Sequence, residues 1–459
     1  MGRQIRLILD CLLLGVVGGL SAQLFLRLLR AANWLFLTRM AGFEPPGVAV
    51  DGGVLTEITG PHGLWLIPLV TTLGGLISGV LVYSLAPEAE GDGSDAAVKA
   101  FHRMGGFIRA RFAPLKMVAS AITIGSGGSA GREGPTAIIS AGVASIYATL
   151  TKRTEEERRL LVLIGMSSDL SAIFRSPIGM SLFSIEVLHG DMEFEGAALL
   201  YTMLGSVVAY AVNGLFAGFQ PLFQVPGNIP IPGLSEYPWY ALLGVTAGLA
   251  AAILPNVLHR VRDLFHAIPV PPHFKPAIGG LGVGLMALAL PQVLGGGYGW
   301  IQEAIDGKIV LSLLFILVFA KMAAVALTIS SGGSGGVFAP SMYIGAMLGG
   351  GFAGLFGQPV AFFVVVGMAA VLAGAGRIPI ATLLMVTEIT GGYHLLVPAA
   401  LAVVVSYLVQ VALTSKLKYE ETEARLAGCK GDWLQVKIGK HEGWLAPDDY
   451  CCNPVTTCP

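Results

Sequence analysis

The chain has 459 residues, of which 54% are hydrophobic and only 12% are charged, and its formal net charge is −1. A soluble domain carries about twice that share of charged residues, so this chain has too little polar surface to fold in water alone. The balanced charge provides no basic stripe, which excludes nucleic acid as a partner. The composition therefore predicts an integral membrane protein.

Long apolar runs recur along the chain, and each is long enough to cross the hydrocarbon core of a bilayer. The clearest runs lie at 64–86, 196–216, 309–320 with a continuation to 329, and 395–413. An earlier run at 5–29 contains Arg6 and Asp10 and has no small-residue cleavage site, so we interpret it as a retained helix and not as a signal peptide. We expect a multi-pass protein embedded in lipid, in the plasma (cell inner) membrane.

The chain contains an internal repeat. Residues 116–135, KMVASAITIGSGGSAGREGP, align without gaps on residues 321–340, KMAAVALTISSGGSGGVFAP, with 12 of 20 positions identical. A second block follows at a shift of 202 residues, in which Arg175, Pro177 and Glu186 match Arg377, Pro379 and Glu388. The order of elements is the same in both halves, which predicts two repeats, inverted if each half has an odd number of spans. A parallel duplication is the alternative.

A proline-rich segment without helical periodicity separates the two repeats. We therefore divide the chain into a first transmembrane repeat (1–218), a linker (219–238), a second transmembrane repeat (239–415) and a polar C-terminal tail (416–459). Residues 431–450 of the tail alternate like two short strands and are similar to the latter half of a bacterial SH3-like module. The tail carries four of the five cysteines, whose spacing favours unpaired thiols over a zinc site or disulfides. Its partner is not indicated.

The glycine-rich part of each repeat has the features of an anion site. Helix N-termini present unpaired N–H groups and the positive end of the helix dipole, glycine lets an ion approach the backbone, and proline suits a first helical turn. Each glycine segment precedes such a helix start, so we expect both starts to converge on one small anion. The candidate anion-binding residues at these helix starts are Arg132, Gly134 and Gly336. Glycine-rich helix crossings are the alternative, but they do not explain the matching prolines.

Glu133 is the most informative single residue of these segments. A carboxylate at a helix N-terminus is stabilised by the same N–H groups that bind an anion, so Glu133 competes for the site. Protonation of Glu133 vacates the site, which makes it a candidate gate. The alternative roles are a helix cap or an ion-pair partner of Arg132.

These motifs resemble those of a known family. GSGGSAGREGP, followed about 200 residues later by SGGSGGVFAP and preceded by the G-x-G segment Gly91 to Gly93, is similar to the CLC family of chloride channels and proton/chloride exchangers over roughly residues 7–415. The resemblance implies an all-α polytopic membrane protein built from two inverted repeats of tilted and broken helices. It also implies a homodimer with one pore per subunit, chloride as substrate and no cofactor.

The resemblance further implies that Glu133 is the gating glutamate, that the Val337 and Phe338 amides line the anion site, and that Lys116 faces the pathway. The family's first signature carries a serine where this chain has Asp92, so the backbone of Gly93 and Ser94 supplies the candidate ligands there.

The family's late tyrosine, which donates its hydroxyl to the ion, falls near Tyr419. The inner glutamate that relays protons in the exchangers falls on Val187, next to Glu186. We expect Glu186 and Glu388 to be structural partners that tie each half together.

Three classes of function follow from these residues: a passive channel, a proton-coupled antiporter and a membrane-embedded enzyme. We favour the channel, because Val187 cannot carry a proton and Glu186 lies about 100° away around a helix. Alternative proton routes run through Asp92 or Glu388. The enzyme is disfavoured because the apolar spans contain no nucleophile–base pair and no metal-ligand spacing, so neither catalytic residues nor a metal are expected.

Overall fold

Sixteen α-helices and five short strands make up the part of the chain that the structure, a computed structural model, describes. This part comprises residues 2–48, 52–61, 63–187, 196–226, 233–418, 425–430, 433–438 and 441–445. The chain divides into two compact units, Met1–Gln410 and Val411–Pro459. The first unit holds all of the helices except the last turns of α16, and the second holds a small antiparallel sheet.

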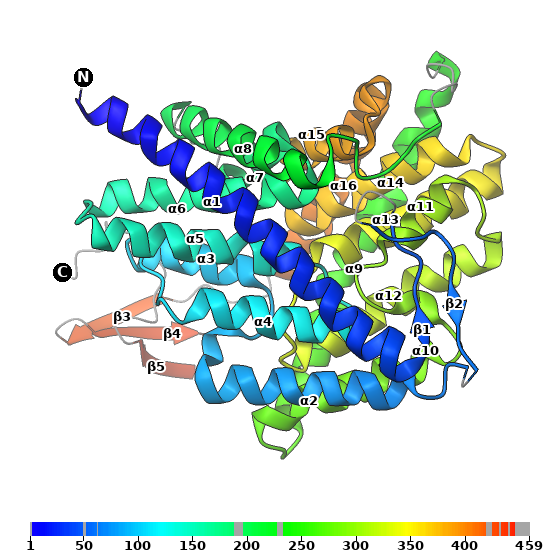
Figure 1. Cartoon of the computed structure of the whole chain (residues 1–459), viewed down its shortest axis with the longest axis horizontal. Helices are drawn as coiled ribbons and strands as arrows, with labels where there is room; N and C mark the ends of the chain where they lie inside the picture. Colours follow the sequence, from blue (N-terminus) through cyan, green and yellow to red (C-terminus); the bar gives the residue numbers. More distant parts are fainter. Residues whose placement is uncertain are drawn as a thin grey trace. The chain divides into compact units, whose positions relative to one another are not determined.

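The first half begins with a long helix, α1 (Gly2–Asn33), which continues as a π-helical segment to Ala41. Figure 1 shows α1 lying across the helices of its own half, where it contacts α4, α6 and α8. Two short strands, β1 (Phe43–Glu44) and β2 (Ile58–Thr59), pair antiparallel after it. The remaining helices of this half are α2 (Ile67–Leu85), α3 (Gly93–Arg103), α4 (Phe112–Gly125), α5 (Glu133–Leu150), α6 (Glu155–Phe174), α7 (Pro177–Glu186) and α8 (Gly196–Ala217).

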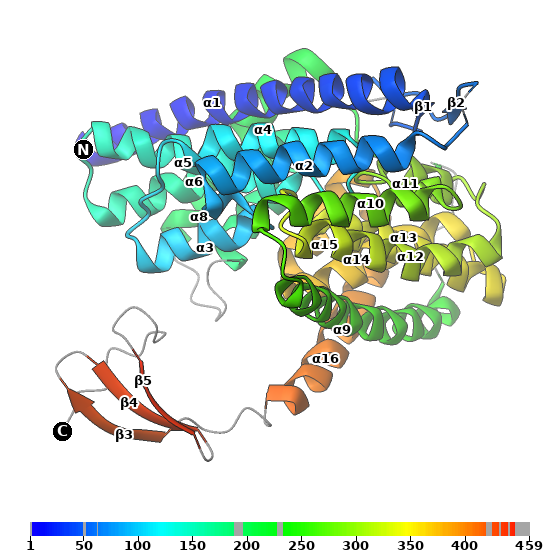
Figure 2. The ribbon, with the colours of Figure 1, turned by 90° about the horizontal axis from the view of Figure 1, so that it is seen from below.

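The second half repeats this order of elements from α10 onward. Its helices are α9 (Tyr237–Ala267), α10 (Lys275–Ala287), α11 (Tyr298–Ile305), α12 (Leu311–Ser330), α13 (Phe338–Phe356), α14 (Val360–Gly376), α15 (Pro379–Thr390) and α16 (Leu396–Lys418). In Figure 2 the helices α1 to α6 and the helices α9 to α14 form two neighbouring groups within the first unit. The segment between α8 and α9, residues 218–236, overlaps the predicted linker at 219–238, whose last two residues begin α9. Residues 227–232 lie outside the described part, and the domain boundaries stay a prediction.

Six helical segments of the described residues are long and apolar enough to cross a membrane. They are Arg3–Ala41, Ile67–Leu85, Ala198–Ala217, Leu234–Ala267, Leu311–Ser330 and Tyr393–Thr414. Shorter apolar helices, namely α4, α14 and α15, complete the bundle. Large apolar side chains such as Leu215 and Val397 are exposed on the spanning helices, where lipid would cover them. The prediction of an all-α, multi-pass membrane protein is confirmed.

The contacts between α7 and α15 show that the two repeats are inverted. Glu186, at the end of α7, accepts hydrogen bonds from the Ile380 and Ala381 N–H groups at the start of α15, at 3.2 and 2.7 Å. Glu388, near the end of α15, accepts them from Ile178 and Gly179 at the start of α7, at 3.2 and 2.8 Å. Equivalent helices therefore run antiparallel, which excludes a parallel duplication.

The same contacts correct one expectation from the sequence. Each glutamate caps a helix of the opposite half, where we expected it to tie its own half together. The equivalent arginines, Arg175 and Arg377, end α6 and α14 in the left-handed conformation, with φ of 58° and 56°. The Arg175 guanidinium also donates to the carbonyls of Ala217 and Gln220, at 3.1 and 2.8 Å. Each arginine is followed within two residues by the proline that begins the next helix, so the chain turns sharply at the same point in both halves.

The second unit contains a three-stranded antiparallel sheet in the order β3 (Arg425–Lys430), β4 (Trp433–Ile438) and β5 (His441–Leu445). The two strands expected within residues 431–450 correspond to β4 and β5. The sequence pattern missed β3, whose pairing with β4 is interrupted by an irregularity between Leu426 and Gly428.

The reciprocal caps predict a measurable loss of stability. Replacing Glu388 with Ala leaves N–H groups at the start of α7 without their acceptor and should lower the free energy of unfolding by about 1–2 kcal/mol. Thermal unfolding in detergent measures this, with Glu156→Ala as the control, because Glu156 is an exposed residue in the first turn of α6. Equal unfolding midpoints for the two variants would contradict a capping role for Glu388.

Candidate functional site

Three glycine-rich segments meet at one point inside the first unit. The backbones of Gly131 and Gly336 exchange two hydrogen bonds, at 2.7 and 2.8 Å, in an antiparallel bridge. Gly91 accepts from the Gly335 N–H and donates to the Gly333 carbonyl, both at 3.2 Å. These contacts lie just before the starts of α3, α5 and α13, so they hold the three helix N-termini together. The two helix starts predicted to converge, those of α5 and α13, therefore do lie together. The segment at 91–93, before α3, lies beside them.

The contact at the centre is too close for side chains. A Cβ on Gly336 would lie 2.6 Å from the Gly134 nitrogen, which no real side chain tolerates. A Cβ on Gly134 would overlap the carboxylate oxygen Oδ1 of Asp92, and one on Gly93 would overlap the Gly134 carbonyl. The backbone at Gly134 is therefore in close contact with both the segment at 91–93 and Gly336.

The Glu133 side chain turns back from the start of α5 toward the start of α13. Its Oε1 accepts a hydrogen bond from the Tyr298 hydroxyl, and its Oε2 accepts one from the Ala339 N–H at 3.3 Å. Only 2% of the residue is exposed. Ala339 is in the first turn of α13, so the carboxylate occupies the place at that N-terminus where an anion would bind.

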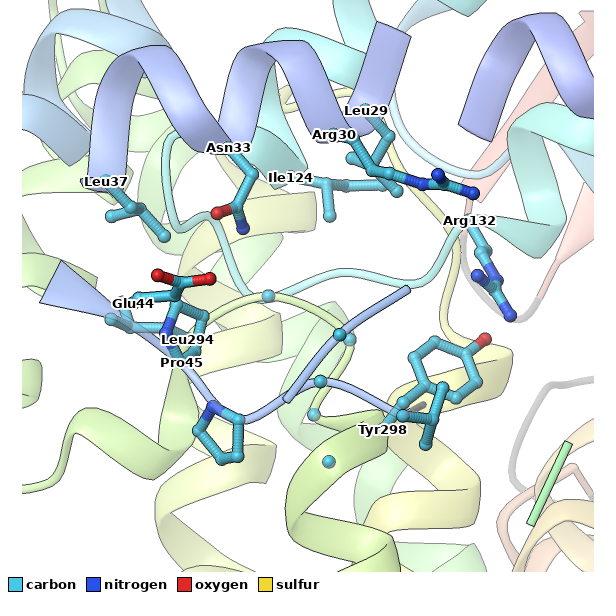
Figure 3. A pocket seen from close by; sticks show the side chains of 18 of the residues that line it. Leu29, Arg30, Asn33, Leu37, Glu44, Pro45, Ile124, Arg132, Leu294 and Tyr298 are labelled. Carbon is cyan, nitrogen blue, oxygen red and sulfur yellow. The ribbon is translucent and has the colours of Figure 1, made fainter. Parts of the chain in front are cut away.

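Arg132 and Tyr298 cover this carboxylate. The Arg132 guanidinium lies over the Tyr298 ring, 4.4 Å from its centroid, and Figure 3 shows the two side chains side by side at the end of a cavity. The Phe223 ring stacks on the Tyr298 ring, with centroids 6.1 Å apart and an interplanar angle of 20°. Arg132 is 4% exposed and provides a cation close to the Glu133 carboxylate.

Sequence reasoning missed Tyr298, although the repeat contains the signal. Lys116 donates to the carbonyls of Ala89 and Gly91, at 3.0 and 2.6 Å, and Lys321 donates to those of Val293 and Gly295, at 2.9 and 2.7 Å. These acceptors are related by a shift of 204 residues, so the turn at 295–298 corresponds in the repeat to the turn at 91–94. Tyr298 is therefore the second-half counterpart of Ser94, at the start of the equivalent helix.

Both lysine side chains are fully buried, so neither is exposed to solvent. The ammonium groups fix the turns that lead into α3 and α11 by binding two carbonyls each. The resemblance implies that Lys116 faces the anion pathway. Its contacts show that it positions the turn that leads into α3.

Two cavities approach the site from different directions. The first, of about 360 Å³, reaches Arg132 and Tyr298 and is also lined by Arg30, Asn33 and Glu44 (Figure 3). The second, of about 430 Å³, reaches Gly91 and Asp92. The start of α10 at Lys275 lines the second cavity, whereas Leu294, beyond the end of α10, lines the first. The two cavities share no lining residue.

The remaining predicted residues lie around this centre. The Phe338 ring meets the Phe183 ring of α7 edge-on at 5.1 Å, and Val187 follows Phe183 by one turn on the same face. Val187 is packed against the apolar core. Gly93 and Ser94 begin α3, while Tyr419 lies outside the described residues.

Similar proteins are consistent with this arrangement. A curated relative from Ralstonia nicotianae, described as a putative chloride channel protein ClcB-like, is 29% identical over 90% of this chain and 95% of its own length. A relative from Salmonella agona, described as an H(+)/Cl(−) exchange transporter ClcA, is 28% identical over 89% of this chain and 87% of its own.

Solved structures share the fold at low sequence identity. A slow cyanobacterial Cl−/H+ antiporter superimposes with a TM-score of 0.78 at 20% identity, over 90% of this chain and 98% of that one. A CLC-type fluoride/proton antiporter gives a TM-score of 0.75 at 22% identity, over 89% and 95%. The family model described as voltage gated chloride channel matches residues 74–411, which contain all three glycine segments. The chain belongs to this family, the CLC proteins.

Proposed function

We propose that this protein carries chloride, or a similar small anion, across a membrane in exchange for protons, and that Glu133 is the gate. The observation that carries the proposal is the Glu133 carboxylate at the N-terminus of α13, bound by the Ala339 N–H and the Tyr298 hydroxyl. A helix N-terminus that binds this carboxylate can bind a free anion in its place.

The anion step follows from competition for these donors. While Glu133 is ionised and bound to α13, it occupies the N–H groups that would bind a free anion. Protonation removes its charge, and the first turns of α5 and α13 then favour an incoming anion through their backbone N–H groups. The Arg132 guanidinium and the Arg30 side chain in the first cavity attract the anion toward the gate.

The exchange function replaces the passive channel that we favoured from the sequence. The relatives from Salmonella are described as proton/chloride exchange transporters, and both solved structures named above are described as antiporters. Chemically, a gate that must take up a proton to release the anion site links the two ions in one cycle. The missing acid at Val187 was the argument for a channel, and it excludes only one proton route.

The setting of this function is also proposed from the family. We propose a homodimer in the plasma (cell inner) membrane, with one pathway per subunit and no cofactor. The reaction is transport and not catalysis, because the chemistry at the site is the exchange of one anionic ligand for another at a helix N-terminus. Chloride is the substrate and needs no covalent step.

The exchange proposal is tested by the reversal potential of reconstituted protein with opposed chloride and proton gradients. We expect the parent's potential to shift with the pH gradient, because each turnover moves protons against chloride. Glu133→Ala lacks the titrating gate and should give a potential that follows chloride alone. If the parent's reversal potential does not change with the pH gradient, exchange is refuted and the passive channel is the function.

A second prediction concerns Tyr298. Tyr298→Phe keeps the ring that Arg132 and Phe223 contact but removes the hydroxyl that binds Glu133, which should weaken the closed state. Since a hydrogen bond to a charged group contributes about 1.5–3 kcal/mol, we expect chloride efflux from liposomes at pH 7.5 to rise about tenfold.

Tyr240→Phe is the matched control, because this buried tyrosine stacks on Phe363 at 4.6 Å and makes no contact with the gate. Its efflux should equal that of the parent. If Tyr298→Phe and Tyr240→Phe have the same efflux, the Tyr298 hydroxyl does not stabilise the closed state.

A further inference from the structure

Asp92 lies beside the start of α5, the helix that carries Glu133. Its Oδ1 contacts the backbone of Gly134, at the place where a side chain of Gly134 would begin. Gly134 follows Glu133 directly, and the Glu133 carboxylate turns the other way, over Gly131 and toward Tyr298. The start of α5 therefore has two carboxylates beside it, those of Glu133 and Asp92.

Asp92 is also in contact with the second cavity. It is partly exposed and lines this cavity of about 430 Å³, which has room for roughly a dozen waters at about 30 Å³ each. The cavity contains other titratable groups that face Asp92. The acidic and phenolic ones are Glu88, Glu90 and Tyr83, and the basic ones are Lys99, Arg262, His266 and Lys275. Water in this cavity can therefore bring protons to Asp92.

The carboxylates at the end of α7 and α15 are occupied by other contacts. Both oxygens of Glu186 accept N–H groups at the start of α15, and both oxygens of Glu388 accept N–H groups at the start of α7. Protonating either one would break a cap that joins the two halves. Val187 has no titratable group. Among these candidates, Asp92 alone combines a carboxylate, access to a cavity and contact with the gating helix.

We propose that Asp92 is the proton carrier between the second cavity and Glu133. Its carboxylate takes a proton from water in the cavity and becomes a neutral acid. It then gives this proton to the Glu133 carboxylate, directly when Glu133 swings inward or through one bridging water, and returns to its ionised form. The O–H bond broken at Asp92 is replaced by one at Glu133, so each cycle moves one proton and consumes nothing.

The same position explains how Asp92 links the proton to the anion. An ionised Asp92 beside Gly134 repels an anion that approaches from the second cavity. Once protonated, it no longer opposes the anion and holds the proton that Glu133 needs. The carboxylate that replaces the hydroxyl residue at this position in the family therefore serves transport instead of obstructing it.

The test measures chloride flux and chloride-driven proton uptake in the same liposomes, and it rests on the exchange function proposed above. Asp92→Asn keeps a side-chain oxygen before α3, where asparagine caps a helix as well as aspartate does, but it cannot titrate. We expect the ratio of protons taken up to chloride moved to fall about a hundredfold. Asp92→Glu should restore much of the proton uptake.

Glu88→Gln is the matched control, because Glu88 lines the same cavity and pairs with Arg109 at 3.5 Å, away from Gly134. It should keep both fluxes. A coupled parent whose Asp92→Asn variant retains the parent's ratio of protons to chloride overturns the role of Asp92 and leaves the exchange function intact. A parent that takes up no protons overturns the exchange function itself.

Discussion

Two helix N-termini that point at each other inside a membrane protein require a negative charge between them. Each end carries roughly half a positive charge on N–H groups that the helix leaves unpaired, and water is scarce at this depth to satisfy them. In this chain α5 and α13 meet in this way, joined at Gly131 and Gly336. Glu133 supplies the charge from within the protein, so the site is filled by a group that protonation can remove. The proposed exchange of this internal anion for a free one rests on the same arrangement.

The rest of the fold keeps these helix ends in place. Lys116 and Lys321 fix the turns before α3 and α11, each through two backbone carbonyls. Glu186 and Glu388 fix α7 and α15 to each other across the two halves. Charged groups that would be costly in a membrane are thus used where they can bind several backbone groups at once. Because the chain contains two repeats, the lysine contact and the glutamate contact each occur twice.

The sequence was sufficient for the parts that depend on pattern. Apolar runs predicted the spanning helices, and the 20-residue repeat predicted two halves whose glycine segments converge. It failed where function depends on a contact between distant segments. Tyr298 has no motif of its own, and its bond to Glu133 spans 165 residues. The target of Glu388 lies on the opposite half, which no spacing rule can reveal. Asp92 was noticed as a departure, but only its contact with Gly134 shows which helix it serves.

The central claim is that Glu133 and a free anion compete for the same N–H groups. Isothermal titration of chloride into detergent-solubilised protein at pH 7.5 tests it most directly, comparing the parent with Glu133→Gln. The glutamine keeps the size of the side chain but lacks the charge that competes with chloride. The account predicts that Glu133→Gln binds chloride more tightly than the parent, by about tenfold or more. Equal affinities for the two proteins would contradict it, because the carboxylate would then have no place in the anion site.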